Sequence, residues 1–434
     1  MRIGFHYFPD TLHYSQSDMD TWLPELQSLE AAWLTLMAPT NRAISEFFLK
    51  ELIAADIQPI VHFQLSFDTP PHLEDLTLLF ETYAHWGVRY VALYDRPNTR
   101  MAWGSTAWGQ YGLVERFLDM YLPLAEASLD AGLTPVFPPL EPGGDYWDTS
   151  FLRTALEAIL RRGHTRLLDN LVLGAYAWAD EHPLNWGAGG PERWPDSRPY
   201  VTPPESQDQR GFRIFDWYIT LSRAVLGNSI PLLLLGMGHR LNRNPDSQQP
   251  LNEADIHTQT NLTIAHLLES DIPPDGQELI PSEVIGGCYW LLTADENSPY
   301  AQQAWYTSKG DVLPIVPTMH KWLQHQYQET LHKARAKKRP SNSTTQPIVH
   351  YLLLPANKLG VSPWHLDIIR PFVNKHQPTI GFSVDEAVHA SHVTVIGGTK
   401  PIPKRTLKRL HAAGCQIDIV EGDGTEIASK LANL

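Results

Sequence analysis

Short apolar runs alternate with longer amphipathic segments from the N-terminus to about residue 325. This alternation is typical of parallel β-α-β construction, in which each strand is followed by a helix that returns the chain to the same edge of the sheet. Eight units of this kind close a barrel, so the pattern predicts a (β/α)₈ TIM barrel. The eight strand-like runs are Ile3–Phe8, Ala32–Met37, Pro59–Gln64, Tyr90–Tyr94, Thr134–Pro138, Leu171–Tyr176, Pro231–Leu235 and Val284–Leu292.

The segments between these runs carry apolar residues at helical spacing. Two connections are much longer than the usual roughly two to six residues: residues 179–210 after the sixth strand and 238–252 after the seventh. In a barrel such loops lie on the face that carries the active site. The predicted helices include Ser45–Ala55, Leu73–Trp86, Val114–Ala131, Phe151–Arg162, Phe212–Leu226 and Ala254–Leu268.

The character of the sequence changes over residues 331–347, where basic side chains are followed by a run of Pro, Ser, Asn and Thr. This composition is typical of a linker. We therefore expect a barrel over residues 1–330, a basic and polar linker over 331–347 and a small α/β domain over 348–434. The predicted elements of the small domain are strands Val349–Leu354, Val393–Ile396 and Gln416–Val420 and helices Trp364–Val373 and Lys404–Ala413.

The bulk composition narrows the classes of function. Hydrophobic residues make up 43% of the 434 residues and charged residues 19%, which is the profile of a globular protein. A net charge of −14 argues against a general nucleic-acid binder, because an acidic surface repels phosphate. No stretch approaches the roughly 20 apolar residues that a membrane helix needs, so we expect no membrane insertion.

The two cysteines, Cys288 and Cys415, lie far apart and predict neither a disulfide framework nor a thiolate metal site. We expect both to be buried. Met1 leads directly into the first strand without the apolar run of a signal peptide. This favours a cytoplasmic location, with association to the cell surface left open.

In a barrel the reactive groups come from the C-terminal ends of the strands and from the loops that follow them. These ends are rich in aromatic rings and in polar groups that bond to hydroxyls. A groove lined in this way suits sugar rings, whose apolar faces stack on aromatic side chains. The candidate substrate-binding residues are His6, Tyr7, His62, Arg96, Asn98, Trp103, Asp145, Tyr146, Trp178, His182 and Trp290.

Glycoside hydrolysis generally uses two carboxyl groups that flank the scissile bond. The carboxylates at predicted strand ends are Asp95, Glu141, Asp145, Asp180, Glu181, Asp295 and Glu296. Histidines also occur at strand ends, but their spacing matches no metal-ligand signature, so we expect no metal and no other cofactor. These histidines are His6, His62, His182 and His239.

The stretch Tyr90–Gly144 resembles an uncharacterised bacterial group in the large barrel clan of glycoside hydrolases. The likeness covers most of residues 1–325 and implies a glycosidase-type barrel. Members of this clan place Asn-Glu-Pro at the end of the fourth strand and a second Glu at the end of the seventh. The matching motifs are Pro97-Asn98, the Trp103–Trp108 region, the turn Pro142–Tyr146, His182-Pro183-Leu184 and Cys288–Leu292.

The chain departs from the clan at both catalytic positions. Asp95-Arg96 stands where the clan has Asn-Glu, and the segment from Leu235 to Arg240 contains no carboxylate. A guanidinium cannot act as a general acid at neutral pH, and glycine cannot be a nucleophile. The resemblance therefore implies a hydrolase-like barrel that lacks the usual catalytic pair.

Three interpretations stay open, and the sequence does not decide whether the protein is an enzyme. In the first, the barrel is catalytically degenerate and binds carbohydrate or a protein partner through an aromatic groove. In the second, relocated carboxylates, Asp95 with Glu141 or Asp180 with Glu181, support hydrolysis. In the third, the chain is an architectural subunit of a larger assembly. The sequence indicates no particular sugar, linkage or oligomeric state.

Residues Gly381–Leu431 resemble a single copy of a cell-wall-binding repeat of bacterial surface proteins. The likeness implies that the small domain is a docking module. The residues that carry it are Val393–Gly398, Leu407–Gly414, Val420–Thr425 and Ile427-Ala428.

Overall fold

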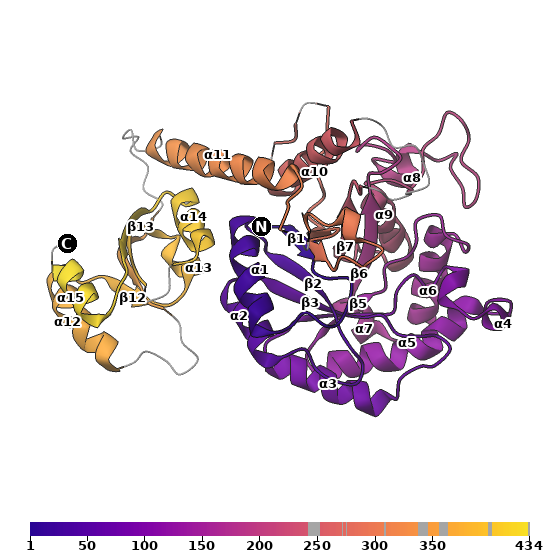
Figure 1. The fold of residues 1–434 in the computed structure, drawn as a ribbon, viewed down its shortest axis with the longest axis horizontal. Coiled ribbons are helices and arrows are strands. Elements are labelled where there is room, and N and C mark those ends of the chain that lie inside the picture. The colour runs from indigo at the N-terminus through magenta and orange to yellow at the C-terminus, as the bar shows by residue number, and fades with distance from the viewer. Residues whose placement is uncertain are drawn as a thin grey trace. The chain divides into compact units, whose positions relative to one another are not determined.

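The computed structural model describes residues 1–241, 252–270, 272–274, 276–307, 310–336, 346–355, 363–397 and 402–432. These residues form two compact units, Met1–His320 and Lys321–Leu434, which are described separately (Figure 1). No helix of the described residues is both long and apolar enough to span a membrane.

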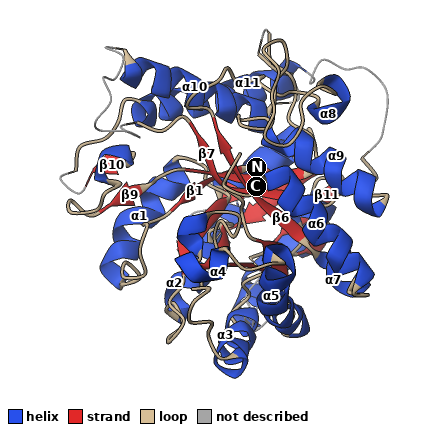
Figure 2. Ribbon diagram, turned by 90° about the vertical axis from the view of Figure 1, so that its right-hand side faces the viewer, coloured by secondary structure: helices blue, strands red, loops and turns tan. Residues whose placement is uncertain are grey.

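The first unit is a closed barrel of parallel strands that pair in sequence order, with β8 returning to β1. Figure 2 shows these strands enclosed by a ring of helices. The predicted fold class, a TIM barrel followed by a smaller α/β unit, is confirmed. The strands are β1 (Ile3–His6), β2 (Trp33–Met37), β3 (Gln58–Phe63), β4 (Tyr90–Leu93), β5 (Thr134–Phe137), β6 (Val172–Trp178), β7 (Leu232–Gly238) and β8 (Val284–Tyr289).

The helices of the first unit pack apolar stripes against the barrel. In α6, for example, Phe151, Leu152, Ala155 and Ile159 are buried at the spacing of one helix face. The long helices are α1 (Gln16–Ser28), α2 (Glu46–Ala54), α3 (Leu73–His85), α5 (Leu113–Asp130), α6 (Asp148–Arg161), α9 (Ile214–Leu226) and α10 (Glu253–Glu269). Helix α11 (Ile315–Ala336) begins in the first unit and continues into the second. Shorter elements are α4 (Ser105–Trp108), α7 (Thr165–Asn170), α8 (Gly190–Arg193) and the paired strands β9 (Thr293–Ala294) and β10 (Tyr306–Thr307).

The barrel interior is filled by small and branched side chains from alternating strand positions, among them Ile60, Val136, Leu233 and Cys288. Near their carboxyl ends β6 and β7 change register, between Ala175 and Tyr176. Such irregularities re-aim the side chains that follow them. They place the last residues of both strands, Tyr176 to Trp178 and Gly236 to Gly238, on the face where the long loops begin.

Helix α11 extends to Ala336 and so covers residues 331–336, the first part of the expected linker. Residues 337–345, which hold the rest of its basic run, lie outside the described residues.

The second unit contains a parallel sheet with the order β12-β11-β13-β14. Helices α12 and α15 share one apolar core with the sheet, and α13 and α14 share the other. Both cysteines of the chain are free and buried, as expected. The elements are β11 (Ile348–Leu353), α12 (Pro363–His376), β12 (Thr379–Gly381), α13 (Val384–Ala387), β13 (Ala390–Ile396), α14 (Lys404–Ala412), β14 (Gln416–Val420) and α15 (Gly424–Ala432).

Candidate functional site

The ends of β4 and β5 bring Asp95, Arg96 and Glu141 together. Arg96 Nε lies 2.9 Å from Asp95 Oδ2, and its Nη1 lies 3.7 Å from Glu141 Oε2. Burial acts to lower the pKa of Arg96, but Asp95 and Glu141 outweigh it and the pKa is raised above its ordinary value. The guanidinium is therefore a permanent cation placed between the two carboxylates that the sequence singles out.

The backbone at this strand end is strained. Tyr94 and Arg96 have φ values of 66° and 44°, in the left-handed region that non-glycine residues rarely occupy. The N–H of Arg96 donates to the carbonyl of Pro139 at 3.0 Å, which fixes the strand end against the segment after β5. Strain of this kind persists only where the surroundings over-determine it, and it clusters at functional sites.

Two stacked aromatic rings lie at the end of β6, and a guanidinium group covers one of them. Tyr176 and Trp178 stack with ring centroids 5.3 Å apart, because alternate strand residues point the same way. The Tyr176 hydroxyl donates to Asp95 Oδ1 at 2.7 Å. On the other side the Arg240 guanidinium lies 3.9 Å from the Trp178 ring centroid. Asp180 holds that guanidinium through its Oδ2, at 2.9 Å from Nε and 2.6 Å from Nη2.

The end of β7 has no room for a side chain. A Cβ on Gly236 would lie 2.6 Å from Trp178 Cη2, and one on Gly238 would lie 2.4 Å from Asn261 Oδ1. Gly238 also has a φ of 106°, which disfavours any other residue. The seventh strand therefore presents backbone, with no carboxylate, to this face.

Asn98 joins the loops after β4 and β5 from inside the protein. Its Nδ2 donates to the carbonyls of Glu141 and Tyr146, each at 2.9 Å, and its Oδ1 accepts the N–H of Glu141 at 2.9 Å. The residue is completely buried. Asn98 therefore positions Glu141 and Tyr146 and has no exposed polar atom of its own. Asp145, in the same turn, is 40% exposed and accepts the N–H of Arg100.

Two predicted stacking residues are buried instead of lining a surface. Tyr7 is completely buried against Phe8, Tyr14 and Phe48. Trp103 is 5% exposed, stacks on Phe67 and donates from Nε1 to the carbonyl of Pro97 at 2.8 Å. Both rings support the loops, and neither offers a free face to a ligand.

Two of the strand-end histidines, His6 and His62, are buried and have lowered pKa values. Burial, aided by the nearby His62, lowers the pKa of His6 to about 3. Burial also lowers the pKa of His62, whose Nε2 donates to the carbonyl of Tyr94 at 2.8 Å. His6 packs against the half-buried Trp290 with ring centroids 4.7 Å apart. His182 stacks on Trp186 in the long loop after β6, with centroids 4.0 Å apart.

The four strand-end histidines do not converge on one point. Within the described residues, the group whose metal-ligating atoms lie within 4.8 Å of one another is Asp10, His13 and Asp295. There both nitrogens of His13 already face carboxylates, at 2.9 Å and 3.3 Å. This arrangement is explained by hydrogen bonding and assigns no metal.

The carboxylate Asp148, at the start of α6, lies under the turn that carries Glu141 and Asp145. It is completely buried and accepts hydrogen bonds from Gly143 N, Gln209 Nε2 and the Tyr218 hydroxyl, at 2.9, 2.5 and 3.0 Å. Burial raises the pKa of Asp148 to about 6, although these three donors act to lower it.

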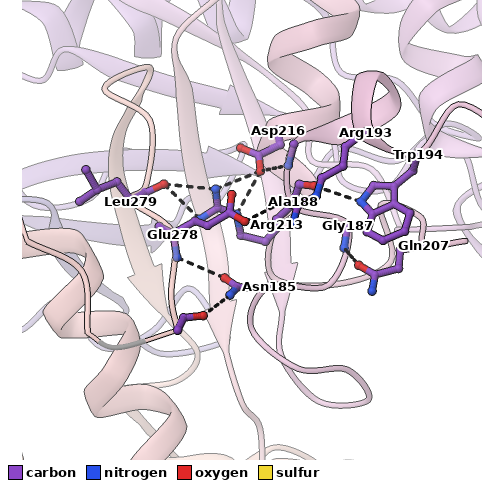
Figure 3. Close-up of polar contacts among 12 residues, drawn as sticks. Asn185, Gly187, Ala188, Arg193, Trp194, Gln207, Arg213, Asp216, Glu278 and Leu279 are labelled. Carbon is purple, nitrogen blue, oxygen red and sulfur yellow. Dashed lines mark hydrogen bonds and ion pairs between the residues drawn. The ribbon is translucent and has the colours of Figure 1, made fainter.

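Much of the long loop after β6 is ordered by a buried arginine (Figure 3). Arg213 is 3% exposed, pairs with Asp216 at 3.0 Å and donates to the carbonyls of Glu278 and Leu279. Asp216 in turn accepts the N–H of Gly189 at 2.9 Å. The loop is thereby tied to the segment that precedes β8. Of the second long loop, residues 242–251 lie outside the described residues.

Tyr176 and Arg240 are not among the site residues that the sequence predicts. Tyr176 lies two positions before the predicted Trp178, so the strand period alone is a signal that both face the same way. Arg240 carries no such signal, because its contact with Trp178 depends on how the ends of β6 and β7 meet. A separate surface hollow of about 600 Å³ lies away from the strand ends, between α3 and α5, where Glu81, His85 and Asp130 line it.

No family model matches the chain, and no curated protein matches it. Solved structures similar to it include glycoside hydrolases. A GH128 (subgroup II) endo-β-1,3-glucanase from Sorangium cellulosum has 13% identity and a TM-score of 0.40, over 74% of this chain and 97% of that one. Xylanase 10B from Thermotoga maritima has 12% identity and a TM-score of 0.44, over 76% and 96%.

The β-galactosidase from the psychrophilic Marinomonas ef1 has 10% identity and a TM-score of 0.43, over 97% of this chain and 75% of that one. The assignment of the barrel rests on its own closed strand order.

Proposed function

We propose that the first unit is a carbohydrate-binding barrel with a glycoside-hydrolase-like architecture and without the usual acid/base and nucleophile pair. The observation that carries the proposal is the position of Arg96, at 2.9 Å from Asp95 and 3.7 Å from Glu141. General acid catalysis needs a carboxyl group that is free to give a proton to the leaving oxygen, whereas here both carboxylates lie against one guanidinium. The glycines at the end of β7 support the same conclusion.

The side chains around Arg96 suit a saccharide. Trp178 and Trp290 are half-buried at the ends of β6 and β8, and Arg96 and Asp145 are exposed at the end of β4 and in the turn after β5. Aromatic rings of this kind stack on the apolar faces of pyranoses, while carboxylate and guanidinium groups bond to the hydroxyls. His6, His62 and Asn98 would then act by holding the rings and loops in place.

The second candidate is hydrolysis by Asp95 and Glu141. It is favoured by one observation: both carboxylates reach the same guanidinium, so they form a close pair of the kind that glycosidases use. In this candidate Tyr176 would hold Asp95 through its 2.7 Å hydrogen bond.

One experiment separates the two candidates. Binding calorimetry and product analysis are run on hexasaccharides of β-1,3-glucan, β-1,4-glucan and β-1,4-xylan and on aryl glycosides, with wild type, Glu141→Gln and Asp95→Asn. We expect binding without turnover. Turnover that either substitution abolishes would establish the hydrolase, and neither binding nor turnover would leave a protein partner or an architectural role.

We assign the region after the linker the role of a docking module, in keeping with its resemblance to a cell-wall-binding repeat. Binding of the full chain to purified peptidoglycan sacculi in a pelleting assay tests this role. A chain that stays in the supernatant at all ionic strengths would contradict it.

A further inference from the structure

Tyr200 occupies the tip of a tight turn in the long loop between β6 and α9. Arg198 and Val201 bridge the turn with two backbone hydrogen bonds of 2.9 Å each, and Pro199 and Tyr200 stand between them. Tyr200 has a φ of 66°. Proline in the second place of a turn and a positive φ in the third are the marks of a type II turn, whose third residue is normally glycine or asparagine.

A tyrosine in this position is unfavourable for the backbone, because a Cβ in the left-handed region crowds the following carbonyl. Residues held in such conformations are retained where the surroundings or a function require their side chain.

The Tyr200 ring is held on one side and open on the other. Its hydroxyl accepts the N–H of Trp147 at 2.8 Å, and the two rings meet with centroids 5.3 Å apart. Trp147 itself is 6% exposed and is covered by Arg210, whose guanidinium the buried Asp208 holds. Tyr200 nevertheless stays 59% exposed. The phenol keeps its own proton for donation, because it uses only an acceptor site in the contact with Trp147.

Tyr200 is also continuous with the candidate site. Trp147 directly follows Tyr146 in the turn after β5, and Asn98 fixes the carbonyl of Tyr146. The exposed carboxylate of Asp145 lies in the same turn. An aromatic face, a free hydroxyl and a neighbouring carboxylate are the groups that recognise a pyranose ring.

We propose that Tyr200 is a rigid stacking platform for one ring of a bound oligosaccharide, at an outer subsite separate from the strand-end centre around Arg96. The proposal rests on the carbohydrate-binding function proposed above and deepens it. Tyr200 adds affinity only for oligosaccharides long enough to extend beyond the strand-end centre around Arg96. It therefore makes the protein select longer oligosaccharides over shorter ones.

The test uses the full chain and the same three hexasaccharides, each compared with its disaccharide by calorimetry. The variants are Tyr200→Ala, Tyr200→Gly and Tyr200→Phe, and the matched control is Tyr111→Ala, which removes a fully exposed tyrosine from the loop after β4. We expect Tyr200→Ala and Tyr200→Gly to weaken hexasaccharide binding about tenfold, with little change for the disaccharide. Tyr200→Phe keeps most of the affinity, and Tyr111→Ala keeps all of it.

Thermal unfolding of the same variants separates strain from binding. Tyr200→Gly should melt at a higher temperature than Tyr200→Ala, because both lack the ring and only alanine keeps the strained backbone. Their affinities should be equal. Wild-type affinity in both variants would overturn the platform and leave the proposed function standing. A wild-type protein that binds none of the hexasaccharides would overturn both.

Discussion

Asp148 is a buried acid whose ionisation opposes folding at neutral pH. Its pKa is raised from an ordinary value near 3.8 to about 6, so the folded protein binds this proton more tightly than the unfolded chain does between those two values. By linkage its stabilising contribution is complete below pH 4 and is lost as the pH rises through 6. The size of the effect is on the order of 3 kcal/mol.

We predict that Asp148→Asn removes this part of the pH dependence. The amide oxygen can accept from Gly143 and Gln209, and the amide nitrogen can donate to the Tyr218 hydroxyl, which then changes from donor to acceptor, so each partner keeps one hydrogen bond to the side chain. Urea unfolding at pH 4, 5, 6 and 7 measures the change. Relative to wild type, the variant should gain stability steadily from pH 4 to pH 7, and parallel curves would refute the assignment.

At the scale of single residues, the sequence predicts which site residues lie close together better than it predicts which of them are exposed to solvent. Asp95, Arg96 and Glu141 end neighbouring strands, so their meeting follows from barrel geometry. The burial of Tyr7 and Trp103 does not follow, because it depends on which neighbouring loop covers each ring. Phe67, which stacks on Trp103, comes from the loop after β3.

At the scale of the elements, the buried guanidinium of Arg213 ties the end of the long loop between β6 and α9 to the segment before β8. Arg213 and Asp216 are 3% and 8% exposed, and the guanidinium also satisfies two backbone carbonyls of the segment before β8. Removal of one partner from a buried pair leaves the other charge uncompensated.

Arg213→Ala should lower the free energy of unfolding by roughly 3 to 5 kcal/mol. The matched control is Arg193→Ala, which breaks the ion pair of an exposed arginine with Glu278 in the same region. That change should cost less than about 1 kcal/mol. Urea titration compares the two, and equal losses would mean that burial of the Arg213 pair adds nothing.

The sequence located all eight barrel strands and the six named helices to within a few residues. The predicted sixth strand ends at Tyr176, but β6 continues to Trp178, and the predicted seventh strand ends at Leu235, but β7 continues to Gly238. Both extensions follow a change of register, which the spacing of apolar residues does not reveal. Helix α1 is not among the predicted helices; few of its residues are buried, and Pro24 interrupts its apolar pattern. Its capping box, Ser15 with Asp18, was a usable signal. Strand β12 is too short to show a pattern.

On the scale of the whole molecule, the two units have separate apolar cores, so we expect two calorimetric transitions. The second unit carries His350 stacked on His392, with centroids 4.2 Å apart, and near His376. Burial and these two histidines lower the pKa of His350, while Asp418 opposes them. A histidine whose pKa is lowered by folding stabilises the folded state above pH 6.5, and this contribution is lost as the pH falls from 6.5 to the lower pKa of the folded state.

We therefore predict that, between pH 7.5 and pH 5.5, one transition shifts to lower temperature through His350, and that His350→Gln reduces the shift of that transition alone. Glutamine keeps a polar end for the 2.9 Å contact with the Thr394 hydroxyl. Scanning calorimetry at both pH values provides the measurement. A single transition, or an equal effect of the substitution on both, would show that the units do not unfold separately.

The packing at the end of β7 also constrains how this barrel can change over evolutionary time. A glutamate at Gly236 would place its Cβ inside the space of the Trp178 indole, and Trp178 in turn supports Arg240. A single mutation toward a hydrolase would thus disrupt the ring that the proposed ligand stacks on before any catalytic benefit arose. A carboxylate at position 236 therefore requires a smaller side chain at position 178 as well, and a directed-evolution test of the proposed function should sample positions 178 and 236 together.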